Sequence, residues 1–500
     1  MIISSLLAMD PAGSITLTLI FCVSCIFLLI LLTTQGRVNG LPPGPKPLPL
    51  LGNILQIERG KMVQSLVKMR EKYGNVFTLY FGKRRVIILT GYQTVKEALV
   101  DQAEEFSGRG ECPSFDACYK NNGLIFTNNM ERWRQLRRFT VVTFKDFGMG
   151  KKIAEDWIKD EAQHIVSEFR KTKGKFFSPN HLLSLASLNV SCFILFGNRF
   201  EYDHKELHTV IEMVHGSFEV ISSAWGQIYE IFPGFMRFIP GKHHKIFKCL
   251  NSLLAFSEER VEICRQKLDP SSPQSYIDSF LIKIETEKDN PNTAFTLPNL
   301  ICNVAQLLFS AADTTSETLN YGILLLLKYP EIQAKVKQEI DQVIGENRSP
   351  TFQDKSKMPY TEAVIHEIQR FINLIPFGAP RATTRDVVFK GYHIPKGTTV
   401  YAMLGTVLND PQCWIDPHHF NPQNFLDDLG NFKKNDGFMP FSAGKRNCLG
   451  EGLARMMLFL FLTTILQNFT LKSPLPSDDL DISPEVSGMG NFPKFYQTYI

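Results

Sequence analysis

The hydrophobic positions of this 500-residue chain follow helical spacing through most of its middle. Apolar residues recur every three to four positions, which places them on one face of an α-helix. The pattern predicts helices over 131–146, 151–172, 181–196, 206–225, 243–268, 297–328, 330–345, 359–372 and 450–468. Strand-like runs over 76–90 predict two strands around a turn at 82–84, and 387–401 predicts a second short β region. We therefore expect a mainly α protein with minor β, in one body that spans residues 55–500.

An uncharged, apolar run covers residues 14–34. Its 21 residues are enough for a helix to cross a hydrocarbon core of about 30 Å. A cleaved signal peptide would have a shorter apolar core and a positive start, whereas Asp10 precedes this run and Arg37 follows it. We therefore expect one N-terminal transmembrane helix within a membrane anchor at 1–36, with the rest of the chain in the cytosol.

A proline-rich hinge is expected at 37–54, between the anchor and the body. Prolines cannot continue a helix and favour a stiff, extended segment. The segment LPPGPKPLPLLGN at 41–53 carries five of them.

Composition excludes some classes of function. The net charge of +4 is too small for a bulk field that attracts nucleic acid. Thirty-nine phenylalanines suggest an apolar interior or an apolar ligand. The ten cysteines lack paired metal spacing, and Cys22 and Cys25 lie inside the apolar run, where we expect two small apolar side chains.

Residues 441–450, FSAGKRNCLG, combine two glycines with a cysteine just before a predicted helix. Glycines permit a tight loop whose backbone approaches a flat cofactor, and a helix N-terminus lowers the pKa of a nearby thiol. The motif (Phe441, Gly444, Arg446, Cys448 and Gly450) resembles the signature of the cytochrome P450 superfamily. FSGRG at 106–110 and FNPQNFLD at 420–427 most resemble vertebrate microsomal family 2. The resemblance implies the cytochrome P450 fold and haem b, with Cys448 as the axial ligand of the iron.

The same resemblance assigns further residues to the haem. Its propionates would contact Arg109, Trp133, Arg137, Arg381 and Arg446. Glu367 and Arg370, three positions apart, would form a structural ion pair. The family adds an arginine to this pair from a later loop, where this chain has Asn424.

Residues 306–318, QLLFSAADTTSET, correspond to the family's oxygen-handling helix. The resemblance implies that Thr314 assists bound O2 and that Asp313 feeds a proton relay. Without the family context, these hydroxyls would be expected to bond back to the helix backbone. Ala311 replaces the usual glycine, so its methyl group would narrow the oxygen groove.

A lipophilic substrate is expected, because the pocket candidates are mostly apolar. By position they are Phe126, Phe309, Ser310, Ile375, Ala379 and Met489. The loop at 228–241, IYEIFPGFMRFIPG, is rich in Phe and Ile and would dip into the membrane.

Basic residues near the thiolate would attract an acidic flavoprotein. They are Arg132, Arg134, Arg138, Lys145, Lys433, Lys434 and Lys445. The resemblance implies NADPH-cytochrome P450 reductase as the partner, with cytochrome b5 as a second candidate, at the cytosolic face of the endoplasmic reticulum.

The reaction implied is the insertion of one oxygen atom of O2 into a fatty acid, steroid or xenobiotic, with electrons from NADPH. Two alternatives remain open at this point. One is a haem-thiolate isomerase or dehydratase that rearranges peroxides without a reductase, which Ala311 favours. The other is a non-enzymatic haem- or lipid-binding protein.

Overall fold

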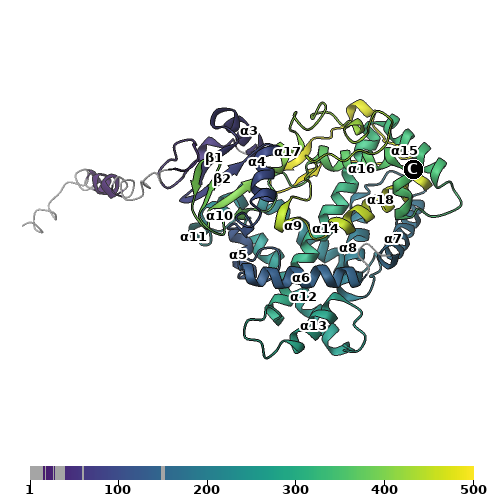
Figure 1. The fold of residues 1–500 in the computed structure, drawn as a ribbon, viewed down its shortest axis with the longest axis horizontal. Helices are drawn as coiled ribbons and strands as arrows, with labels where there is room; N and C mark the ends of the chain where they lie inside the picture. The colour runs from purple at the N-terminus through teal and green to yellow at the C-terminus, as the bar shows by residue number, and fades with distance from the viewer. Residues whose placement is uncertain (1–14, 17, 26–27, 29–39, 59–60, 148–151) are drawn as a thin grey trace, which may run out of the picture.

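A computed structural model describes residues 15–16, 18–25, 28, 40–58, 61–147 and 152–500 (Figure 1). The predicted span at 14–34 lies only partly within these residues: 15–16, 18–25 and 28 are helical, and nearly all are exposed. No helix among the described residues has both the length and the apolar character needed to cross a bilayer. The predicted anchor therefore stays a prediction.

The nine helices predicted from periodicity are confirmed, with ends that differ by at most three residues. They are α6 (Met130–Asp146), α7 (Lys152–Lys171), α8 (Asn180–Phe196), α9 (Lys205–Ser222), α12 (His244–Lys267), α14 (Leu297–Lys328), α15 (Pro330–Val343), α16 (Pro359–Ile372) and α18 (Glu451–Asn468). Helix α9 ends early because Ser223 adopts an extended conformation and its side chain accepts from the Gly226 N–H, which caps the next helix.

Shorter helices were not predicted, because a few turns carry little periodic signal. They are α3 (Met62–Tyr73), α4 (Tyr92–Lys96), α5 (Pro113–Tyr119), α10 (Ala224–Ile231), α11 (Pro233–Met236), α13 (Tyr276–Thr286) and α17 (Leu404–Leu408). Helices α10 and α11 occupy most of the segment that was predicted to be a loop at 228–241.

The main sheet has the strand order β1-β2-β7-β4-β3. Its strands are β1 (Val76–Phe81), β2 (Arg84–Leu89), β7 (Thr399–Ala402), β4 (Arg381–Ala382) and β3 (Gly108–Arg109). The predicted strand pair is confirmed as the antiparallel β1 and β2, and β2 pairs in parallel with β7. At the far edge, Arg109 pairs with Arg381, which brings two predicted haem contacts together.

Two small hairpins complete the β structure. They are β5 (Val387–Phe389) with β6 (Tyr392–Ile394), and β8 (Pro484–Ser487) with β9 (Asn491–Pro493).

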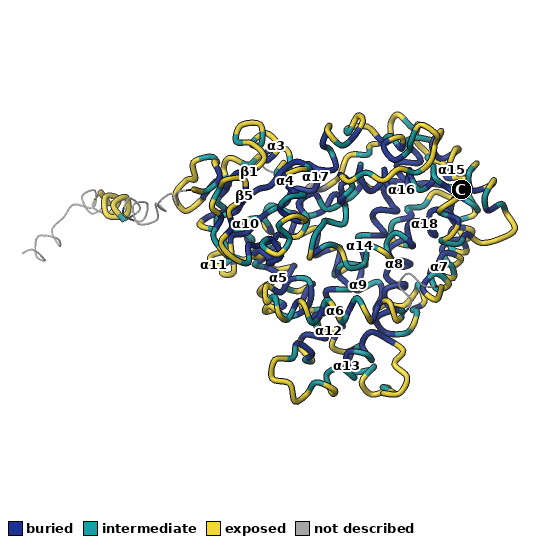
Figure 2. The backbone as a smooth tube through the Cα atoms, in the orientation of Figure 1, coloured by how far each residue is buried: buried dark blue, intermediate teal, exposed yellow. Residues whose placement is uncertain are grey.

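Helix α14 runs through the centre of the helical part, and most of its residues are buried (Figures 1 and 2). It packs against α8, α12, α16 and α18. The sheet lies at the end of the body opposite the C-terminus. Burial on all sides explains why α14 is apolar around most of its circumference.

The described part of the proline-rich segment, which was predicted to be a hinge, is fixed to this sheet. Thr78 donates its side-chain O–H to the carbonyl of Pro42 (2.8 Å) and its backbone N–H to that of Pro43 (2.8 Å). A Cβ on Gly44 would lie 2.0 Å from the Thr78 carbonyl oxygen, so the contact requires glycine. The proline-rich segment is therefore held along β1 at Pro42 and Pro43.

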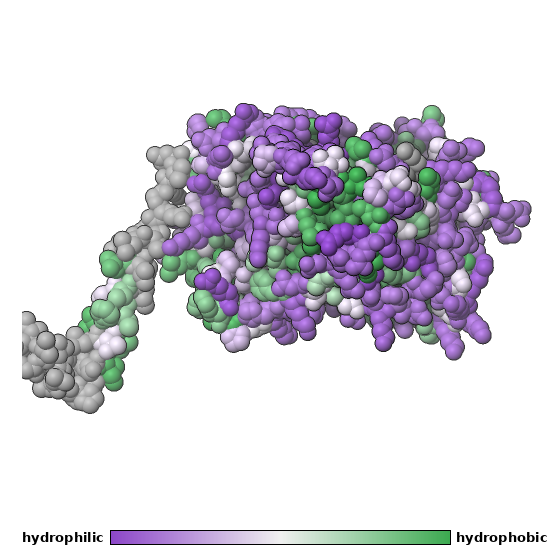
Figure 3. Space-filling view, turned by 90° about the horizontal axis from the view of Figure 1, so that it is seen from below, coloured by the Kyte–Doolittle hydropathy of each residue, from purple (hydrophilic) through white to green (hydrophobic). Residues whose placement is uncertain are grey.

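Apolar side chains are exposed around α10 and α11. Phe235 and Phe238 are 68% and 71% exposed, and Trp225 is 40% exposed. The face seen from below in Figure 3 is largely hydrophilic, with a hydrophobic area at its centre. The exposure of these aromatic side chains agrees with the predicted apolar surface at 228–241.

Candidate active site

Cys448 lies in a loop between a 3₁₀ turn, η5 (Gly444–Arg446), and the start of α18. Its backbone N–H donates to the Phe441 carbonyl (2.9 Å), which closes the loop. Gly444 has a φ of +72°, and a Cβ there would lie 1.7 Å from the Leu99 carbonyl oxygen. Gly450 is different, because its φ is −85° and a Cβ would meet nothing within 4 Å. The loop conformation therefore requires Gly444, whereas at Gly450 it leaves room for a flat group.

The Cys448 side chain is exposed, yet enough of the chain surrounds its sulfur that burial raises the pKa of the thiol. The backbone N–H groups of Gly450 and Glu451 act in the opposite direction, and so does the charge of Arg137. These donors belong to the first turn of α18, whose dipole also favours a thiolate. A bound metal cation would complete the stabilisation of the anion.

Four arginines gather beside this loop. The Arg446 guanidinium lies 4.3 Å from the ring of Trp133 and donates to the carbonyls of Ser107, Leu124 and Thr127. Arg137 donates to the Asn447 carbonyl (3.1 Å) and side-chain oxygen (2.5 Å). Arg381 donates to Ser442 Oγ (2.9 Å), and Arg109 donates to the carbonyl of Ile125 (2.8 Å). The structure thus brings together all the residues predicted to contact the propionates.

These four cations lack negative partners, because none forms an ion pair with a carboxylate in the described part of the chain. Arg109, Arg381 and Arg446 are buried. Burial and the neighbouring guanidiniums lower the pKa of Arg446 to about 7 and hold that of Arg381 well below its usual value. Burial lowers the pKa of Arg109 to about 10. Buried charges are costly unless paired, so this cluster fits an anionic group with two carboxylates, such as haem b.

A family model for Cytochrome P450 matches residues 42–498. The chain belongs to the cytochrome P450 family. It is 47% identical to Cytochrome P450 2G1 of Oryctolagus cuniculus over 489 residues, which are 98% of this chain and 99% of the relative. It is 50% identical to Cytochrome P450 2A5 of Mus musculus over 483 residues, or 96% of this chain and 98% of the relative. Cytochrome P450 2B4 of Oryctolagus cuniculus is 49% identical over 471 residues, covering 94% and 96%.

The predicted P450 fold and the resemblance to family 2 are thereby confirmed. This P450 is a haem-thiolate monooxygenase, an oxidoreductase that uses haem b and O2 with electrons derived from NADPH. The non-enzymatic alternative is excluded by the same finding.

Helix α14 of this P450 is unbroken across the predicted oxygen-handling segment. Thr314 donates its O–H to the Ser310 carbonyl, and Ser310 donates to that of Gln306, both at 2.7 Å. Both hydroxyls therefore bond back to the helix, while both residues and Ala311 stay partly exposed. Asp313 is buried and faces α9 rather than sharing these hydrogen bonds.

Of the six residues predicted to line the pocket, two are buried and four are partly or fully exposed. Phe126 and Phe309 are buried in an aromatic cluster around Phe115, with ring centroids 4.1 and 5.4 Å from that ring. Ser310, Ile375 and Met489 are partly exposed, and Ala379 is exposed. Ring stacking at 4.8 Å between Phe309 and Phe218 extends the cluster to α9. Sequence reasoning missed Phe115 and Phe218, because only the fold brings α5 and α9 to α14.

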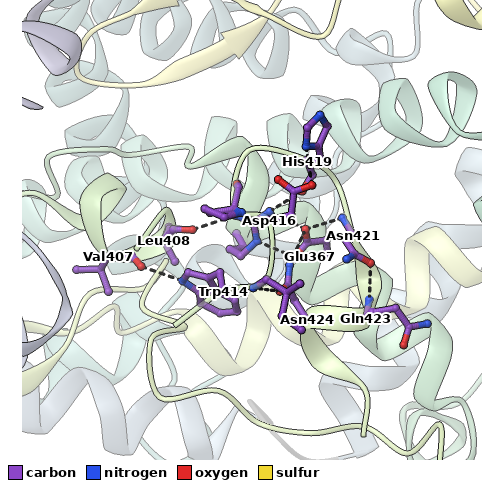
Figure 4. A network of polar contacts seen from close by, with 12 residues as sticks. Glu367, Val407, Leu408, Trp414, Asp416, His419, Asn421, Gln423 and Asn424 are labelled. Carbon is purple, nitrogen blue, oxygen red and sulfur yellow. Dashed lines mark hydrogen bonds and ion pairs between the residues drawn. The ribbon is translucent and has the colours of Figure 1, made fainter. Parts of the chain in front are cut away.

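The Glu367–Arg370 ion pair is present and completely buried (Figure 4). Arg370 donates to both carboxylate oxygens (2.6 and 2.7 Å) and to the carbonyls of Leu408, Pro417 and His419. Asn424 stands where the family adds an arginine to this pair. Its side-chain amide lies 3.4 Å from each carboxylate oxygen of Glu367. This network joins α16 to the loop before the cysteine.

Most of the predicted basic residues are exposed around α6 and the cysteine loop. Lys445 pairs with Glu104 (2.9 Å), and Arg134 lies 3.7 Å from the same carboxylate. Glu104 therefore neutralises part of this surface. Arg138, Lys145, Lys433 and Lys434 form no ion pair within the described residues.

Proposed function

We propose that Cys448 ligates the haem iron and that Arg109, Arg137, Arg381 and Arg446 hold the haem propionates, with Trp133 packed against Arg446. The observation that carries this proposal is the group of four guanidiniums beside the thiol, none of which has a carboxylate partner among the residues that the structure describes. Phe441, Gly444 and Gly450 would shape the loop against the ring. The bound haem supplies oxygen activation, which a thiolate ligand promotes by donating electron density.

The chain's own residues would organise the rest of the reaction. Ser310 and Thr314 present hydroxyls on the partly exposed face of α14, and Thr314 would release its bond to Ser310 to hold the oxygen that reacts. Asp313 would supply protons. The apolar cluster around Phe126 and Phe309 would orient a lipophilic substrate and exclude water, with Ile375, Ala379 and Met489 completing the pocket.

The proposal for haem ligation is tested by the Cys448→Ser variant. We expect the red-shifted carbon monoxide band of the reduced enzyme to disappear, because an alcohol is a far weaker donor than a thiolate. Cys264→Ser, at a partly buried free cysteine on α12, is the matched control and should keep the band. An unchanged band in Cys448→Ser would exclude this residue as the ligand.

We further propose NADPH-cytochrome P450 reductase as the electron donor, with cytochrome b5 as a second donor. The exposed arginines and lysines around α6 and the cysteine loop support an acidic partner. Turnover that requires NADPH and the reductase is expected. Turnover that does not depend on NADPH or on the reductase would contradict the proposed donor.

The substrate class and location are part of the same proposal. We expect fatty acids, steroids or xenobiotics to bind, and a screen for substrate-induced shifts of the haem spectrum would identify them. The apolar run at 14–34, the hinge and the exposed Phe235 and Phe238 support attachment to the endoplasmic reticulum, with the body in the cytosol.

A further inference from the structure

Two buried carboxyl groups lie one turn apart on α14, away from the arginine cluster. Asp313 and Glu317 are each 1% exposed. Asp313 Oδ2 accepts no hydrogen bond within the described residues, whereas Glu317 accepts one from the Asn320 amide (3.1 Å). A buried acceptor without a donor is costly, so the position of Asp313 needs an explanation beyond packing.

A histidine on α9 connects Asp313 to solvent. His215 Nδ1 lies 3.6 Å from Asp313 Oδ2, just beyond hydrogen-bond length. The histidine side chain is 52% exposed, and that of Asp313 is 2% exposed. Asp313 raises the pKa of His215, and in return His215 opposes the rise that burial causes in the pKa of Asp313. The two groups therefore compete for protons across the boundary between solvent and interior.

Other charged groups lie near this pair. Glu219 follows His215 by one turn and pairs with Lys245 of α12 (3.0 Å). Asn180 of α8 opposes the rise that burial causes in the pKa of Glu317. The charge of Glu317 in turn adds to the rise that burial causes in the pKa of Tyr321 and Tyr496.

The ring of Phe492, next to β8 on β9, lies 6.0 Å from the His215 ring and covers one side of it. Asp481, before β8, pairs with Lys494 (2.5 Å). Its charge adds to the rise that burial causes in the pKa of Tyr321. Within the described part of the chain, His215 is thus the half-exposed titratable group that lies against Asp313.

We propose that His215 is the solvent-side proton donor of Asp313. Water first protonates the free Nε2 of a neutral imidazole that carries its proton on Nδ1, and the resulting imidazolium then gives the Nδ1 proton to the Asp313 carboxylate at Oδ2. This leaves a neutral imidazole with its proton on Nε2, and proton exchange with water restores the starting tautomer. No electrons move and no other bond changes. The proposal rests on the proposed role of Asp313 and extends its proton path to the surface. His215 would be a positioning residue, since it acts on the reaction through Asp313.

The pair can be tested without turnover by infrared difference spectra recorded during a pH titration. Asp313→Asn and Glu317→Gln identify the two carboxyl bands. In His215→Gln, the midpoint of the Asp313 band should move to higher pH, because the charge that opposes protonation of Asp313 is gone. His208→Gln, two turns earlier on α9, is the control and should leave the midpoint unchanged. A midpoint in His215→Gln equal to that of the wild type would overturn the proposal.

A kinetic measurement separates a proton donor from a structural neighbour. NADPH oxidation by the complete enzyme with reductase, without added substrate, would be compared in H2O and D2O across pH. We expect His215→Gln to slow it about tenfold or more and to enlarge the solvent isotope effect, with no such change in His208→Gln. Equal rates and isotope effects in His215→Gln and wild type would contradict the proposal.

If the reduced wild-type enzyme showed no red-shifted carbon monoxide band, the proposed haem ligation would be contradicted instead. The infrared titration would still report on His215 and Asp313.

Discussion

The side-chain amide of Asn424 lies 3.4 Å from both carboxylate oxygens of Glu367, and its own oxygen accepts the backbone N–H of Ile415 (2.8 Å). A neutral donor therefore stands where the family carries a second arginine. Glu367 and Arg370 are left as one cation with one anion, and the remaining guanidinium hydrogens point to three backbone carbonyls. The ion pair is charge-balanced and completely removed from water.

Glu367→Gln should destabilise the protein strongly. The substitution leaves the Arg370 charge buried without an anion, which costs about 3–5 kcal/mol. Urea unfolding followed by circular dichroism measures the change. Glu285→Gln breaks an ion pair with the same i,i+3 spacing, to Lys288, but on an exposed surface where water screens the charges, so its effect on stability should be much smaller. Equal effects of the two substitutions would refute the prediction.

Gly444→Ala should prevent the cysteine loop from closing. A Cβ at this position would lie 1.7 Å from the Leu99 carbonyl oxygen, and the φ of +72° is strained for alanine. We expect little haem-loaded enzyme, measured as the ratio of haem absorbance to protein. Gly452→Ala, where a Cβ would meet nothing within 4 Å on helix α18, should load normally or gain stability by up to about 1 kcal/mol. Normal loading of Gly444→Ala would show that the loop tolerates a Cβ.

The sequence predicted the long helices well because each repeats its apolar spacing over several turns. It could not predict the short α5, so the contact of Phe115 with Phe126 and Phe309 was missed. Periodicity also does not determine side-chain rotation: Thr314 and Asp313 are neighbours in the chain, yet one bonds back to Ser310 and the other faces His215.

The arginines of the candidate site were found only by family resemblance. What makes them a site is that segments hundreds of residues apart meet, as in the pairing of Arg109 with Arg381. Local pattern does not contain that information.

Arg381→Gln should weaken haem retention. Glutamine can keep a donor for Ser442 but removes one of the cations assigned to the propionates. A hydrogen bond to a charged group contributes about 1.5–3 kcal/mol, so haem should transfer to apomyoglobin about ten times faster or more. Arg385→Gln, at an exposed arginine paired with Glu105, is the control and should leave the transfer rate unchanged. Identical rates for Arg381→Gln and wild type would remove this arginine from the haem site.

Stability should fall as pH rises through neutrality, in part because of Glu317. Burial, the first cause, and the charge of Asp313 raise its pKa from 4.5 to about 7. A carboxyl whose folded pKa is raised binds more protons when folded, so its contribution is complete below about pH 4.5 and is lost as pH rises through about 7. The loss is on the order of 3 kcal/mol. Glu317→Gln cannot ionise, so the stability difference between variant and wild type should grow in the variant's favour from pH 5 to 8. A difference that does not change with pH would contradict the raised pKa.

The exposed phenylalanines near α11 should enter the lipid phase. Helix α11, which contains Phe235 and ends just before Phe238, lies at the end of the body that holds β1 and β2 (Figure 1). Phe176 contacts Tyr499 near the C-terminus, at the opposite end. Burying an exposed phenylalanine side chain contributes about 1.5–3 kcal/mol, so two of them favour a stable orientation. In vesicles that carry the full chain, a reagent confined to the lipid phase should label the peptide with Phe235 and Phe238. The peptide with Phe176, which is 57% exposed, is the internal control and should stay unlabelled. Labelling of Phe176 alone would place the opposite end of the body at the membrane.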